Sequence, residues 1–105
     1  MKTTVEQKAL QSDTTFYHKQ QVTIKSNIEL VELKLNKLHD KFQKVCFKIE
    51  ALEIKRDALI EANKSSYRVE DAIYELEIEQ SEINEDIEEQ EKKLNQLSKK
   101  LLKVS

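Results

Sequence analysis

The sequence predicts an all-α fold, a long antiparallel helical hairpin with coiled-coil packing. The 105 residues include no Gly, Pro or Trp, so the tight turns with positive φ on which sheet proteins depend have no glycine to form them. Charged residues make up 36% of the chain and hydrophobic residues 38%, a balance typical of long solvated helices. Along most of the chain, apolar residues recur at alternating spacings of three and four, which places them on one side of a helix.

The first 12 residues have scattered apolar positions without a sustained period, and we expect a flexible N-terminal segment there. Residues 13–105 are expected to form the hairpin itself. Ser12 and Asp13 are suitable N-cap residues for a first helix over about residues 13–63.

This first helix has an apolar seam of about five heptads that begins at Ile24 and is interrupted at Arg56. Its members share the a and d positions when Ile28 is taken as position a: Ile24, Ile28, Val31, Leu35, Leu38, Phe42, Val45, Ile49, Leu52 and Leu59. A seam of this length is typical of a coiled coil.

A second helix is expected over about residues 67–104, because a second seam follows there in a shifted phase. It contains two polar members, Gln80 and Gln90, among Val69, Ile73, Leu76, Ile83, Ile87, Leu94, Leu97, Leu101 and Val104. Ser65 or Ser66 is a candidate N-cap, and the expected turn spans about residues 64–66.

The phase break at residues 63–68 is also compatible with one continuous helix that contains a stammer. Charge favours the hairpin, because Lys41, Lys48 and Lys55 would then lie beside Glu79 and Asp86. A hairpin centred on Ser66 predicts a register in which the numbers of facing residues add to 132. Leu52 would then face Gln80, and Phe42 would face Gln90.

The first helix also has apolar residues on the side opposite its seam, and these are the candidate protein-interaction residues. Leu30, Leu33, Phe47 and Ile54 occupy positions c and f, with Cys46 and Ile60 at nearby e positions. A hairpin of two helices would leave this stripe exposed to solvent. We therefore expect self-association or a partner to complete a three- or four-helix bundle.

Two kinds of occupant remain open for the stripe. One is internal to this protein: a second hairpin, or the N-terminal segment with Phe16 and Tyr17 folded back over the stripe. The other is a helical segment of a different protein. The expected function is therefore that of a non-enzymatic coiled-coil adaptor or structural subunit. The alternative is a small client-binding chaperone, of a secretion or virion-assembly type, that shields an amphipathic helix.

Residue patterns for catalysis, cofactors and metals are missing from the sequence, so we expect no enzymatic activity and no small-molecule substrate. His39 and Cys46 are seven residues apart, about 10 Å along a helix, which is too far for one metal ion to join them. No phosphate-binding loop or nucleophile motif occurs.

The charge balance argues against nucleic acid and membranes as partners. The formal net charge is −2, although residues 70–91 hold 11 acidic and no basic side chains. No apolar run approaches the length of a membrane span or a signal peptide. Cys46 is the single cysteine, which weakly favours a reducing, intracellular location.

Overall fold

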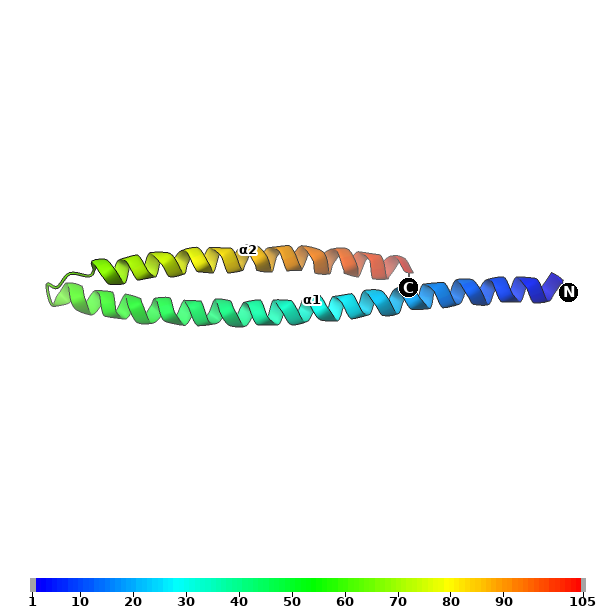
Figure 1. Ribbon diagram of the computed structural model, residues 1–105, viewed down its shortest axis with the longest axis horizontal. Coiled ribbons are helices and arrows are strands. Elements are labelled where there is room, and N and C mark those ends of the chain that lie inside the picture. Colours follow the sequence, from blue (N-terminus) through cyan, green and yellow to red (C-terminus); the bar gives the residue numbers. More distant parts are fainter. Residues whose placement is uncertain (1, 105) are drawn as a thin grey trace. The chain divides into compact units, whose positions relative to one another are not determined.

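The computed structural model describes the backbone of residues 2–104 and the side chains of residues 16–104 (Figure 1). Two long helices, α1 (Lys2–Glu61) and α2 (Tyr67–Val104), form a hairpin, and the described residues contain no strand. The predicted all-helical hairpin is therefore confirmed. The helices are separated by a break at residues 62–66, where the alternative required one continuous helix with a stammer. The flexibility predicted for residues 1–12 stays a prediction, since their side chains lie outside the described residues.

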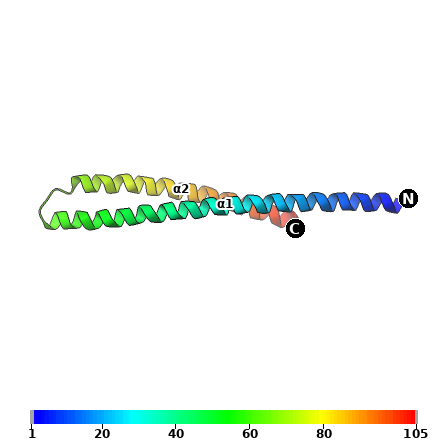
Figure 2. The same ribbon diagram turned by 60° about the horizontal axis from the view of Figure 1, so that its bottom comes forward.

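The chain divides into two compact units, each built from a segment of both helices. The first unit comprises residues 1–33 and 91–105, and the second comprises residues 34–90. The second unit includes the turn, and its two helical segments run antiparallel and side by side in both views (Figure 1, Figure 2).

The predicted seams form the core of each unit. Every a and d residue from Ile24 onward is buried or half-buried, including Arg56, Gln80 and Gln90. In the second unit the buried side chains are Leu35, Val45, Ile49, Val69, Ile73, Ile83 and Ile87, and in the first unit Val31 is buried. Val45 retains 4% exposure, and no described side chain is completely enclosed. Two helices therefore bury one narrow row of side chains and leave their other faces open.

The turn begins where α1 ends in a Schellman motif. The amide N–H of Lys64 donates to the Leu59 carbonyl at 2.8 Å, and that of Asn63 donates to the Ile60 carbonyl at 3.0 Å. Asn63 occupies the position after the cap with φ 55°, a left-handed conformation that asparagine tolerates better than most residues. At the other side of the turn, the Ser66 carbonyl accepts the first hydrogen bond of α2 from the Glu70 N–H at 2.9 Å. Ser66 thus occupies the N-cap position.

The register differs from the prediction by about one heptad. In the second unit, Gln80 Nε2 donates to Cys46 Sγ at 3.1 Å, and in the first unit Gln21 Nε2 donates to the Val104 carbonyl at 2.7 Å. The residue numbers of these pairs add to 126 and 125, whereas the predicted register required 132. The predicted partner of Gln80, Leu52, lies about 9 Å further along α1 than Cys46. The predicted facing pairs are therefore wrong, although a residues still face d residues.

The charge complementarity that favoured the hairpin produces no ion pairs at the predicted positions. Among the described residues, Lys41, Lys48 and Lys55 form no salt bridge with Glu79 or Asp86. Arg56 and Asp57, which are neighbours in the chain, form a charged contact at 3.3 Å. Apolar burial, rather than flanking ion pairs, is therefore the main source of stability.

Candidate protein-interaction surfaces

The second unit presents part of the predicted stripe on the outer face of α1. Phe47 is 58% exposed and Ile54 is 72% exposed. Ala51 and Ala58 are also exposed, and the series 47, 51, 54, 58 has spacings of four, three and four. This is the spacing of a coiled-coil seam, so this face has the side-chain pattern needed to pack against another helix.

The other predicted stripe residues of the second unit lie at its margins. Ile60 is exposed in the last turn of α1. Cys46 is half-buried, because its thiol accepts the hydrogen bond from Gln80 on α2. The structure therefore places Cys46 at the contact between the helices rather than on the outer face.

The first unit presents its own exposed apolar side chains on α1. Leu30 and Leu33 are exposed, as predicted from their positions opposite the seam. Val22 is half exposed as well, and the sequence interpretation missed it, although it precedes Leu30 by eight residues, about two helical turns. Phe16 and Tyr17 contact each other edge to face, with ring centroids 6.0 Å apart.

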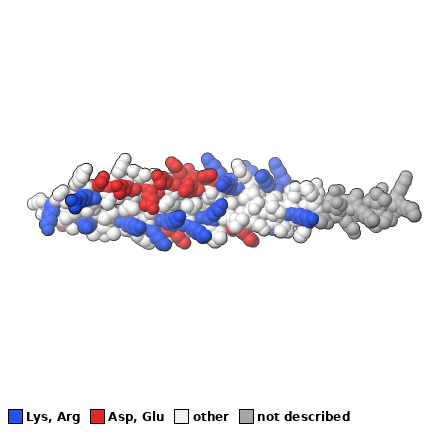
Figure 3. Space-filling view, in the orientation of Figure 1, with Lys and Arg blue, Asp and Glu red and all other residues white. Residues whose placement is uncertain are grey.

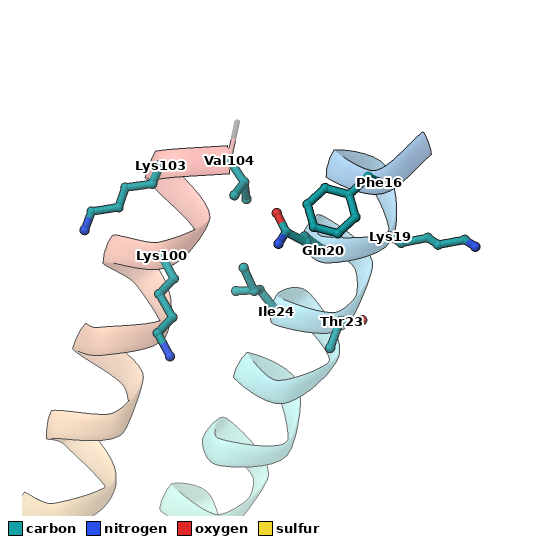
Figure 4. Close-up of a pocket in the computed structure, with 8 residues that line it drawn as sticks. All are labelled: Phe16, Lys19, Gln20, Thr23, Ile24, Lys100, Lys103 and Val104. Carbon is teal, nitrogen blue, oxygen red and sulfur yellow. The ribbon is translucent and has the colours of Figure 1, made fainter. Parts of the chain in front are cut away.

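An open groove lies between α1 and the C-terminal end of α2 in the first unit. It encloses about 470 Å³ and is lined by Phe16, Lys19, Gln20, Thr23, Ile24, Lys100, Lys103 and Val104. Figure 4 shows that Gln20, Ile24 and Val104 point into the space between the helices. Lys19 and Lys103 point away from this space on opposite sides, and Lys100 extends along α2, so the groove has an apolar floor and is flanked by basic side chains. We call it the basic groove.

A second groove of about 480 Å³ lies beside the Cys46–Gln80 hydrogen bond in the second unit. Three carboxylates, those of Glu50, Glu53 and Glu77, contribute to its lining. Glu53 comes from α1 and Glu77 from α2, so like charges from both helices border this groove. The described residues contain no group of three or more His, Cys, Asp or Glu side chains that could hold a metal ion.

The outer face of α2 in the second unit is acidic with an aromatic centre. Tyr74 is 63% exposed and Ile78 is 44% exposed, one helical turn apart. Asp71, Glu75 and Glu82 are exposed on the same side of the helix. Figure 3 shows acidic side chains gathered along α2 in this unit. We call this surface, residues 71–82, the acidic face.

Basic side chains dominate the first unit and acidic side chains the second. The described side chains of the first unit include seven Lys against three Glu, a net charge of +4. The second unit has nine Lys or Arg against 15 Asp or Glu, a net charge of −6. The formal net charge of −2 for the whole chain hides this difference.

No protein family model, curated protein or solved structure matches this chain. Within the described residues, neither helix has a stretch that is both long and apolar enough to cross a bilayer.

Proposed function

We propose that this chain is a non-enzymatic structural subunit or adaptor whose outer α1 face packs against a helix of another polypeptide. The observation on which the proposal rests is the exposure of Phe47 and Ile54 on the face opposite the seam. Soluble proteins rarely leave a regular row of large apolar side chains in water unless a partner covers it. A helix docked on this row completes the packing as a three-helix bundle, and two hairpins that share it form a four-helix bundle.

The geometry of the row supports a helical partner in particular. The small side chains of Ala51 and Ala58 alternate with Phe47 and Ile54. Alternating large and small residues let the side chains of a second helix fit between them. Helix-in-groove recognition uses anchors one or two turns apart, and positions 47 and 54 are separated by two turns.

The proposal predicts that Phe47→Glu with Ile54→Glu abolishes partner binding. Burial of each side chain stabilises a complex by about 1.5–3 kcal/mol, so the loss of both weakens it about a hundredfold or more. The measurement compares the mass in solution of the full chain with that of the variant, and compares the proteins each captures from a cell extract. We expect the parent, but not the double variant, to form a complex of reproducible composition.

The matched control is Lys41→Gln with Lys48→Gln, which changes the net charge by the same amount at exposed positions on a flank of α1 in the same unit, about a third of a turn from Phe47 and Ile54. The control should retain the complex. If the stripe variant keeps the same mass and captures the same proteins as the parent, the outer face of α1 is not the interaction surface. Release of the captured protein on exchange into fresh buffer would favour a client-binding chaperone over a permanent subunit.

A further inference from the structure

We infer that the basic groove binds the acidic face of a second copy of this chain, so that copies associate head to tail. This contact uses neither Phe47 nor Ile54 and does not depend on the proposed function. Its basis is the complementarity of two surfaces that the same chain carries at different places.

Both surfaces have apolar side chains at their centre. The basic groove has Phe16, Ile24 and Val104 in its lining, and the acidic face has Tyr74 and Ile78 at its centre. A groove between two helices accepts a third helix whose apolar side chains are one turn apart. Tyr74 and Ile78 have that spacing, and their combined exposure leaves apolar area to be buried on docking.

The charges around these apolar centres are opposite. Lys19, Lys100 and Lys103 border the groove, and among the described residues none of them forms a salt bridge. The acidic face surrounds its apolar centre with carboxylates at Asp71, Glu75 and Glu82. Docking therefore brings these ammonium groups beside carboxylates, and the described side chains of the two units that supply them have net charges of +4 and −6.

The contact joins two different surfaces, so it is heterologous rather than two-fold symmetric. Each copy that uses its groove still has a free acidic face, and each copy that uses its face still has a free groove. Such a contact extends into a chain of copies or closes into a ring. The acidic run at residues 70–91 and the lysines at 99, 100 and 103 would thus act together in this contact.

The test uses two charge-reversed variants of the full chain. Lys100→Glu with Lys103→Glu reverses the rim of the groove, and Glu75→Lys with Glu82→Lys reverses the acidic face. Sedimentation velocity over a range of concentrations measures association at about 0.05 M and about 0.5 M salt, where charge screening differs strongly. We expect the unmodified chain to associate at low salt and to dissociate at high salt, and each variant alone to associate about tenfold or more weakly.

A mixture of the two variants provides the decisive measurement. The reversed groove of one variant is acidic and complements the basic face of the other, while the unmodified groove and face of the two variants also still match. An equimolar mixture should therefore recover salt-sensitive association. Because recovery requires both variants to be folded, it also excludes misfolding as the cause of the loss.

The matched control, Lys37→Glu with Lys44→Glu, reverses two exposed lysines on α1 of the second unit and changes the net charge equally. It should associate as the unmodified chain does. The inference is overturned if the unmodified chain shows no association at low salt, if the mixture stays dissociated, or if the control loses as much association as the groove variant. The Phe47 and Ile54 variant should retain this salt-sensitive association, which separates a failure here from a failure of the proposed function.

Discussion

Gln80 and Gln90 are the two polar members of the seam on α2, and they differ in their hydrogen bonding. The Gln80 amide donates to the Cys46 thiol, whereas Gln90 Oε1 is buried and has no hydrogen-bond partner among the described residues. A buried acceptor without a partner costs about 1–3 kcal/mol, because it has lost its water and gained nothing in exchange. Gln90 therefore lowers the stability of the second unit.

Replacement of Gln90 by Leu should stabilise the second unit. The substitution removes the unpaired oxygen and extends the apolar seam, so we expect the free energy of unfolding to rise by about 1–2 kcal/mol. Urea denaturation followed by circular dichroism measures the change. Gln80→Leu is the control and should gain less, since it loses the hydrogen bond to Cys46. A decrease in stability for Gln90→Leu would show that the amide oxygen is satisfied in solution.

At the scale of the elements, the C-terminal cap of α1 decides where the hairpin turns. The Schellman motif ends α1 at Glu61, and Asn63 takes the left-handed conformation that a glycine would normally supply in a chain that has none. The Ser66 cap then starts α2 within a few residues. The turn therefore depends on one residue with positive φ.

We expect Asn63→Val to destabilise the hairpin by about 1–2 kcal/mol, because a β-branched side chain clashes with the backbone at positive φ. Asn63→Gly should be neutral or slightly stabilising. Thermal unfolding of both variants measures the difference. Lys64→Val is the matched control, since Asn63 is the one described residue other than glycine with positive φ. Equal effects of valine at 63 and 64 would contradict the role of the cap.

The register between the helices can be tested through the thiol of Cys46. In the observed register Gln80 covers this half-buried thiol, so Gln80→Ala should increase its alkylation rate several-fold. Mass spectrometry after timed exposure to iodoacetamide measures the rate. Glu88→Ala, at an exposed position two turns further along α2, should leave it unchanged. An unchanged rate for Gln80→Ala would support the register in which Gln80 faces Leu52.

At the scale of the whole molecule, the chain presents two kinds of candidate interaction surface, which differ in how their contacts respond to salt. The outer face of α1 is apolar, and its contacts should persist at high salt. The basic groove and the acidic face are charged at their rims, so their contact should weaken as salt screens it. Salt and the two sets of variants therefore separate an assembly formed through one surface from an assembly formed through the other.

The sequence by itself determined the elements and the seams. An absence of Gly and Pro, together with three-four spacing in two long series, admits little except long helices, and every residue predicted at an a or d position is buried or half-buried in the structure. The exposure of Phe47 and Ile54 followed from their positions opposite the seam. The half-burial of Cys46 could not be predicted in this way, because an e position lies at the edge of the contact and its burial depends on the partner helix.

Only the tertiary structure decided the register and, with it, which residues line each groove. When one helix slips by seven residues along the other, every a residue again faces a d residue. The apolar pattern of the sequence is therefore compatible with both registers. The length of the turn breaks this degeneracy. If the centre of the turn moves by half a heptad along the chain, the pairing between the helices moves by a whole heptad. The Asn63 cap places the turn at residues 62–66. That shift puts Gln80 against Cys46 and Val104 beside Gln21, which no local pattern in the sequence specifies.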